Sequence, residues 1–306
     1  MTQSATVAAG QMLDHVVVNA MFETDAAAVC FAALGFALTP RGYHSLGSVN
    51  HLMMFGDHYL ELVGLPVGAT TVRREILESR LGIDGLVFSS GDAQATYARL
   101  RSAGIDASEP QTFSRPVQID GSEQLARFAT TRLTPGELPA GRVYFCEHLT
   151  PQWVFRDEWT HHPNGARALT ELTVVSADPL AEAQRYALTA GQGEVVPASD
   201  GDRAKSATLR MPGFTLSFAT EAQYRARYGP LACNAADRDS YFGALTVEVT
   251  DLAPIRTRVA ALATQQDCAV TVADTTSAAG QPSIAVLLNS LNTLIEFIGT
   301  VEHAHS

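Results

Sequence analysis

Two ionisable residues interrupt apolar, strand-like segments near the start of the chain. His15 lies within the β-branched run 13–18, and Glu61 lies between two leucines in the run 58–63. A neutral imidazole binds Fe, Mn, Co or Zn, and a carboxylate that faces a cleft serves as an anionic ligand or as a base. Structural roles are the alternatives, because a lone strand histidine is usually a core or edge residue and a strand carboxylate commonly faces solvent.

Three further polar residues are candidates for contact with a substrate. His44 and Asn50 flank a loop that contains Gly47. Both side chains could hydrogen-bond a substrate, and His44 could also move a proton near neutral pH. Turn formation alone would explain Asn50 and Gly47 equally well. Arg115 is a candidate to bind an anionic group of the substrate, with an ordinary surface arginine as the alternative.

The elements that must position these residues form a repeat of strand, helix and three strands. The first copy is predicted as a strand at 13–18, a helix at 25–34 that ends before Gly35, and strands at 36–44, 49–55 and 58–63. The second copy is predicted as a strand at 83–88, a helix at 92–103, and strands at 111–117, 127–132 and 142–146. β-Branched runs indicate the strands, and apolar residues at helical spacing indicate the helices.

Two more copies follow in the second half. The third begins with a strand at 169–175 and a helix at 180–189, and the fourth has a strand at 242–249, a helix at 254–265 and strands at 284–288 and 294–298. Segment 59–64 (YLELVG) matches segment 294–299 (LIEFIG) in residue type at every position but the first. The sequence therefore predicts an α+β fold of four tandem βαβββ modules. An α+β protein whose alternation imitates a repeat is the alternative.

Paired modules are expected to form two domains with curved mixed sheets around a cleft. The chain of 306 residues exceeds the roughly 100–200 residues of one domain. Pro, Asn and Gly in segment 159–166 mark the boundary. The predicted organisation is a tail at 1–11, a domain with the site at 12–166, a second domain at 167–300 and a tail at 301–306.

Charge, cysteine spacing and motif content narrow the classes of partner. The net charge of −11 disfavours nucleic acid and anionic membranes, and no apolar run reaches the ~20 residues that span a bilayer. The four cysteines are widely spaced and form no CxxC pair, so we expect free thiols and a cytoplasmic protein. The chain has no GxGxxG, GxxxxGK[ST], HExxH or GxSxG motif, so the functions that these motifs indicate lack support.

Several segments of the first half resemble the glyoxalase-like branch of the vicinal oxygen chelate superfamily. Segment 41–50 (RGYHSLGSVN), followed by 59–62 (YLEL), is similar to a Gly-x-His-x-x-Gly-Thr-x-Asn loop before a Tyr-Leu-Glu-Leu strand, with Ser48 in place of the usual Thr. Segments 145–151 (FCEHLTP) and 162–166 (HPNGA) are similar too. The resemblance covers roughly residues 13–175 and implies paired modules around a U-shaped cleft, with a divalent metal on its floor.

The resemblance implies that metal ligands come from the first and fourth strands of each module, which assigns His15 and Glu61. For the second module, strand alignment favours Glu147 whereas the family pattern favours His148. Adjacent strand residues point to opposite faces, and we select His148. Gly85 takes the first-strand position there and cannot bind a metal. The resulting set of two histidines and one carboxylate suits Fe or Mn, with Zn, Co and Ni as other candidates.

The second half offers fewer ligands. Glu171 and Ala244 take its first-strand positions and Glu296 a fourth-strand position, without a histidine, so we expect no metal there. Closing the cleft, supporting a homodimer and binding a ligand are the roles left open. The predicted function is a metal-dependent isomerase, lyase or dioxygenase that acts on a small oxygenated metabolite and stabilises an enolate or oxyanion, with Glu61 or His44 moving a proton. The alternative is a metal-free ligand-binding protein of the drug-sequestering resistance type.

Overall fold

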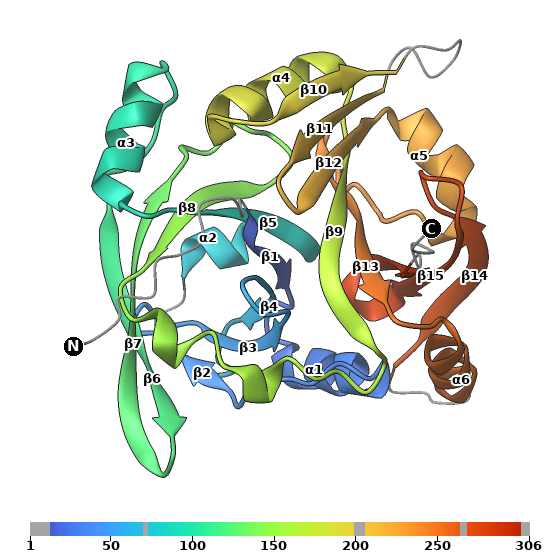
Figure 1. The fold of residues 1–306 in the computed structure, drawn as a ribbon, viewed down its shortest axis with the longest axis horizontal. Coiled ribbons are helices and arrows are strands. Elements are labelled where there is room, and N and C mark those ends of the chain that lie inside the picture. The colour runs from blue at the N-terminus through green and yellow to red at the C-terminus, as the bar shows by residue number, and fades with distance from the viewer. Residues whose placement is uncertain (1–12, 70–72, 199–205, 264–267, 301–306) are drawn as a thin grey trace, which may run out of the picture.

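The computed structural model describes residues 13–69, 73–198, 206–263 and 268–300. It contains two mixed sheets of eight strands each, with helices arranged around them (Figure 1). The strand order is β2-β3-β4-β1-β5-β8-β7-β6 in the first sheet and β10-β11-β12-β9-β13-β16-β15-β14 in the second. The second order repeats the first with every number raised by eight, so the two halves share one topology.

The first sheet is built from two modules. Its strands are β1 (Leu13–Asn19), β2 (Gly42–Tyr43), β3 (Val49–Met54), β4 (Tyr59–Gly64), β5 (Gly82–Ser89), β6 (Gln111–Ile119), β7 (Ser122–Arg132) and β8 (Arg142–His148). The helices are α1 (Thr24–Ala33), α2 (Arg74–Leu77) and α3 (Ala93–Ser102), and the 3-10 turns Pro151–Trp153 and Asp157–Trp159 lead to the second sheet.

The second sheet repeats this plan. Its strands are β9 (Ala166–Val175), β10 (Glu194–Pro197), β11 (Ala207–Met211), β12 (Phe214–Ala219), β13 (Tyr241–Val249), β14 (Val270–Thr276), β15 (Pro282–Leu288) and β16 (Thr293–Gly299). The helices are α4 (Pro179–Ala190), α5 (Glu221–Tyr228) and α6 (Ala253–Leu262), with 3-10 turns at Gly229–Leu231 and Asn289–Leu291.

Strand pairing shows how the modules combine. In each half the first strand of a module pairs in parallel with the fourth, as β1 does with β4 and β5 with β8. The first strands of paired modules are antiparallel neighbours, as are β1 and β5. The chain therefore forms four βαβββ modules that pair two by two, and the predicted α+β architecture is confirmed. The division into two domains at residues 166–167 stays a prediction.

Two local predictions differ from the structure. The strand predicted at 36–44 forms only at Gly42–Tyr43, because Pro40 has no N–H to donate to a ladder and the N–H of Ala37 donates instead to the His162 ring. Helix α5 was not anticipated. Its start is fixed by a reciprocal cap in which Thr220 and Gln223 bind each other's backbone N–H groups.

The first sheet has two unlike faces. One, which we call the core face, carries Val16, Leu60 and Leu86 and joins the equivalent face of the second sheet in a single apolar cluster. The other, the site face, carries the polar candidates His15 and Glu61. Because side chains alternate along a strand, the same sequence builds a core on one side and a site on the other.

Buried polar and covalent links also join the two halves. Arg80 is 4% exposed, and its guanidinium donates to the carbonyl of Ile83 in its own half at 2.7 Å. It also donates to the carbonyl of Phe242 in the other half at 2.5 Å. Cys30 and Cys268 form a disulfide, so the expectation of free thiols is wrong for this pair, while Cys146 and Cys233 are free and buried. Residues 238 apart in sequence meet here only because the modules pack together.

No helix within the described parts of the chain is long and apolar enough to cross a membrane.

Candidate functional site

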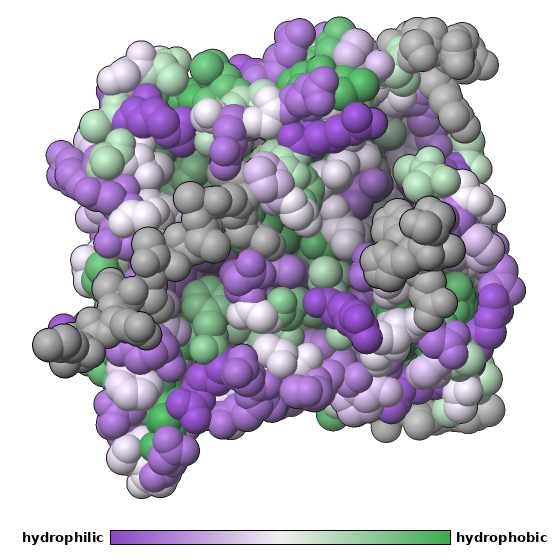
Figure 2. Space-filling model, in the orientation of Figure 1, coloured by the Kyte–Doolittle hydropathy of each residue, from purple (hydrophilic) through white to green (hydrophobic). Residues whose placement is uncertain are grey.

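The site face of the first sheet forms a cleft of about 1220 Å³. Figure 2 shows hydrophobic side chains set between hydrophilic ones on the viewed face of the molecule. The predicted site residues His15, His44, Asn50, Glu61 and Arg115 all line the cleft, and His148 is not among its lining residues. Five residues that are distant in sequence therefore share one cavity. Arg115 is 4% exposed, so the reading of it as a surface arginine is wrong.

A β-bulge in β1 places Asp14 beside His15. The pairing of β1 with β5 shifts register between Leu13 and His15, and such a bulge lets adjacent side chains leave the strand on the same side. Asp14 Oδ1 lies 2.5 Å from His15 Nδ1 and accepts a hydrogen bond from it. The second nitrogen, Nε2, is then free to accept or to bind a metal, and it faces the cleft. The ring of Tyr59 stacks on the His15 imidazole, with 4.4 Å between the ring centroids, and fixes the plane of the imidazole.

Two oxygens from other strands approach His15 Nε2. Glu61 Oε2 lies 3.6 Å away and the Tyr144 hydroxyl 3.2 Å away. Burial raises the pKa of Tyr144 above its usual value, and the neighbouring Glu61 charge adds to that effect. Tyr144 therefore keeps its proton and donates a hydrogen bond to the imidazole. The three side chains come from β1, β4 and β8 and meet on the floor of the cleft.

Glu61 is ionised although it is buried. Burial acts to raise its pKa, but electrostatic interactions with His15 and Arg142 and a 2.7 Å hydrogen bond from Asn50 Nδ2 to Oε1 together lower it. Burial lowers the pKa of His44 to about 4. His44 is thus neutral near pH 7, with Nδ1 2.9 Å from the Ser48 hydroxyl and Nε2 3.2 Å from Asn50 Nδ2. Asn50 Nδ2 donates hydrogen bonds to both His44 and Glu61, and these bonds orient the Glu61 carboxylate.

Tyr144 is the residue that sequence reasoning missed. In the antiparallel pairing of β1 with β5, Val16 lies opposite Leu86, so the symmetry of the two modules relates Val17 to Val87. Val17 pairs with Glu61 in β4, and Val87 pairs with Tyr144 in β8. Tyr144, and neither Glu147 nor His148, is therefore the second-module equivalent of Glu61. The same pairing confirms Gly85 as the counterpart of His15. No spacing rule in the sequence reveals this register.

Glu147 and His148 point to opposite faces, as alternation requires. Glu147 Oε2 accepts a 2.8 Å hydrogen bond from the N–H of Ala93, at the start of α3 on the core face. His148 Nε2 instead lies 2.9 Å from Asp14 Oδ2. Glu147 is thus committed to capping a helix, where a carboxylate is favoured. Of the two candidates, only His148 lies on the site face, where it contacts Asp14 and does not line the cleft.

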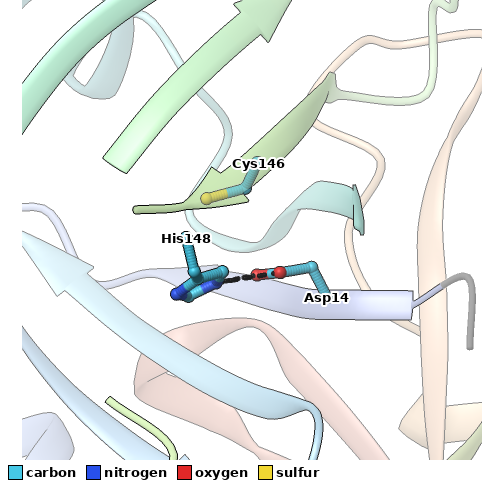
Figure 3. Close-up of side chains that lie close together, drawn as sticks. All are labelled: Asp14, Cys146 and His148. Atoms are coloured by element: carbon cyan, nitrogen blue, oxygen red, sulfur yellow. Dashed lines mark hydrogen bonds and ion pairs between the residues drawn. The ribbon is translucent and has the colours of Figure 1, made fainter. Parts of the chain in front are cut away.

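His148 belongs to a second cluster beside His15. Among the described residues, Asp14, Cys146 and His148 form a group whose ligand-type atoms all lie within 4.8 Å of one another (Figure 3). Burial raises the pKa of Asp14, but the charges of His148 and His15 and their hydrogen bonds outweigh it and hold the pKa well below its usual range. Burial raises the pKa of the Cys146 thiol far above its usual value. Asp14 is an anion shared by two imidazoles, beside a protonated thiol.

The equivalent face of the second sheet is filled. Glu296, the counterpart of Glu61, is fully buried and accepts from Arg227 Nη2 at 2.6 Å and from the Tyr228 hydroxyl at 3.0 Å, both on α5. Tyr224 and Tyr228 pack there against Ala244 in an apolar cluster. Helix α5 therefore lies where a ligand would bind. Within the described residues, the charged groups that act on Glu171 are Arg227 and Glu296.

Comparisons with known proteins agree with this architecture. A family model described as a glyoxalase-like domain matches residues 13–189, more than half of the chain. No curated protein sequence matches. Three solved structures share the fold at 9–15% identity. They are a hypothetical protein from Staphylococcus aureus (TM-score 0.58, 11% identity, 94% of this chain and 99% of that one), a mutant 4-hydroxymandelate synthase from Streptomyces coelicolor (0.52, 15%, 95% and 92%) and a Mn(II)-bound glyoxalase from Novosphingobium aromaticivorans (0.55, 9%, 96% and 83%). With its paired βαβββ modules, the chain belongs to the glyoxalase-like domain family of the vicinal oxygen chelate superfamily.

Proposed function

We propose that this protein is an enzyme of the vicinal oxygen chelate type that uses a divalent metal held by His15 and Glu61 to act on a small oxygenated metabolite. One observation carries the proposal. His15 Nε2 and Glu61 Oε2 converge to 3.6 Å on the cleft floor. Two donors that share one cation at about 2.1 Å are separated by roughly 3.0–3.4 Å, so small side-chain movements suffice.

The surroundings of His15 fit a ligand. A metal-binding histidine usually donates its other ring N–H to a carboxylate, which fixes the tautomer and raises the basicity of the ligand nitrogen. Asp14 makes that contact with His15 Nδ1. Glu61 is ionised, as a ligand must be. The Tyr144 hydroxyl, on the same nitrogen, could turn to donate to a substrate oxygen.

A bound divalent cation would supply a Lewis acid that stabilises negative charge on substrate oxygens. The chain's own groups do the rest. Glu61 is positioned by Asn50 and His44 to bind or to accept a proton, and Tyr144 keeps a proton that it can donate to a developing oxyanion. Isomerisation, elimination and ring cleavage all benefit from such stabilisation, so the proposal covers these three reaction classes.

Metal analysis of purified variants tests the proposal. We expect about one equivalent of a divalent metal in the wild type, and a loss of metal affinity of at least tenfold in His15→Ala and Glu61→Gln, each of which removes one ligand. Cys146→Ser is the matched control, because this thiol lies in the neighbouring cluster. Loss of metal in Cys146→Ser but not in His15→Ala would move the site to Asp14, Cys146 and His148.

One observation favours a second candidate function. The Tyr144 hydroxyl already satisfies His15 Nε2 at 3.2 Å, so the site is complete without a cation. A metal-free protein that binds a ligand in the cleft would show this arrangement. Ligand binding that is tight, shows no turnover and is unchanged by a chelator would identify this function and overturn the first.

A further inference from the structure

Two arginines in the cleft have hydrogen-bond donors that the protein does not use. Arg115 lies on β6, and Arg142 lies on β8, two residues before Tyr144 and on the same face. Arg115 Nη2, Arg142 Nε and Arg142 Nη2 are buried and have no hydrogen-bond partner among the described residues. Leaving a buried charged donor unpaired is costly, which indicates that a ligand completes these bonds.

The unpaired atoms of Arg142 form a recognisable pair. Nε and Nη2 lie on one edge of the planar guanidinium, and this edge matches the two oxygens of a carboxylate. The other three arginines of the cleft differ, and one of them, Arg238, donates from Nη1 to Asp84 Oδ1. Arg73 donates to Glu75 Oε1, and Arg132 donates to Gln111 Oε1 at 2.8 Å. Among the arginines that line the cleft, buried donors without a partner in the described residues thus belong to Arg115 and Arg142 alone.

The guanidiniums of Arg115 and Arg142 both interact electrostatically with Glu61. The charge of Arg142 acts on Glu61, and the charge of Glu61 acts on Arg115. A ligand near Glu61 is therefore within the field of two cations. An apolar surface adjoins them, because Phe113 and Phe128 line the same cleft with stacked rings 5.2 Å apart. The cleft thus combines an anion-binding edge with an aromatic wall.

We propose that the substrate is a carboxylate with an apolar, ring-sized body. Its carboxylate binds the Nε–Nη2 edge of Arg142, a second oxygen accepts from Arg115 Nη2, and its body lies against Phe113 and Phe128. The proposal rests on the function proposed above, because it names the substrate class of the same cleft. It does not depend on which reaction follows.

Calorimetric binding of 3-phenylpropionate and of its amide, 3-phenylpropionamide, tests the inference on the full-length protein after chelator treatment. The amide has the same size and lacks the charge. We expect the carboxylate to bind at least about tenfold more tightly, because a charge-assisted pair of hydrogen bonds is worth more than 1.4 kcal/mol. Equal binding of the two probes would overturn the proposal, as would tighter binding of inorganic phosphate.

Variants locate the binding edge. Arg142→Gln should remove the preference for the carboxylate, and Arg142→Lys, which keeps the charge without the planar fork, should retain only part of it. Arg132→Gln is the matched control, because Arg132 lines the same cleft but already has a partner. Circular dichroism checks that each variant is folded. An Arg142→Lys protein that is folded and binds as the wild type does would contradict the assignment.

A comparison of metal content and ligand binding in the same variants separates this inference from the proposed function. In chelator-treated protein, His15→Ala should still bind 3-phenylpropionate, because the arginines hold the carboxylate. If His15→Ala and Glu61→Gln leave metal content unchanged while Arg142→Gln abolishes binding, the metal proposal fails and the substrate class stands. If metal content depends on His15 while Arg142→Gln binds normally, the substrate class fails and the metal site stands.

Discussion

At the scale of single residues, the site depends on carboxylates that stay ionised despite burial. Asp14 and Glu61 each have a lowered pKa, because imidazoles and hydrogen bonds outweigh desolvation. His44 shows the opposite balance, since burial dominates and its pKa falls to about 4. The result is a pair of anions next to imidazole nitrogens, an environment that favours a cation.

The pKa of His44 leads to a prediction about pH. A histidine whose pKa is lower in the folded than in the unfolded state makes the protein less stable as the pH falls below the pKa of the unfolded state, about 6.5. We expect the unfolding free energy contributed by His44 to fall by about 2 kcal/mol between pH 7 and pH 5, since its folded pKa is about 4. Urea unfolding of wild type and His44→Gln measures the difference. An equal pH dependence in both proteins would show that His44 titrates normally.

At the scale of elements, strand register and one helix distinguish the two halves. In the first half, Gly85 places no side chain on the sheet floor, and Val17 leaves no room for one, since an added Cβ would lie 2.7 Å from Val17 Cβ. In the second half, α5 covers the corresponding face and pairs Arg227 with Glu296. The same module plan thus produces an open cleft once and a filled one once.

The Arg227–Glu296 pair predicts a stability effect. Arg227→Met leaves Glu296, which is fully buried, without its cation, and breaking such a pair costs about 3–5 kcal/mol. Chemical denaturation followed by circular dichroism measures this loss. The double variant Arg227→Met, Glu296→Leu should recover much of the stability, since no buried charge remains. A single variant as stable as wild type would show that α5 does not depend on this pair.

At the scale of the whole molecule, the two sheets share one apolar core. Residues such as Val16 and Leu86 from the first sheet cluster with Leu172 and Phe297 from the second. Arg80 adds hydrogen bonds across the boundary. The halves are therefore expected to depend on each other for stability, although the proposed metal ligands His15 and Glu61 both lie in the first.

Cooperative unfolding is the corresponding prediction. Both tryptophans, Trp153 and Trp159, belong to the segment that follows the first sheet, so their fluorescence reports on that half, whereas far-ultraviolet circular dichroism reports on both. Because the core is shared, the two signals should give one coincident transition in urea. Two separated transitions would show that the halves unfold independently.

The sequence by itself determined the modules and most of the candidates. Alternating and helical periods depend on local geometry, so the four βαβββ units, the shared endings at 59–64 and 294–299, and the cleft positions of His15 and Glu61 could be predicted. The equivalence of Gly85 in the second module to His15 in the first also followed from the repeat.

Tertiary structure decided the rest, because strand register and bulges are properties of pairing between distant segments. Alternation places Tyr144 and His148 on the same face, but only the pairing of β5 with β8 shows that Tyr144 meets His15. A bulge in β1 turns Asp14 towards two histidines, and the packing of α5 closes the second site. Contacts of this kind depend on where strands and helices lie in space, which the order of residues along one strand does not specify.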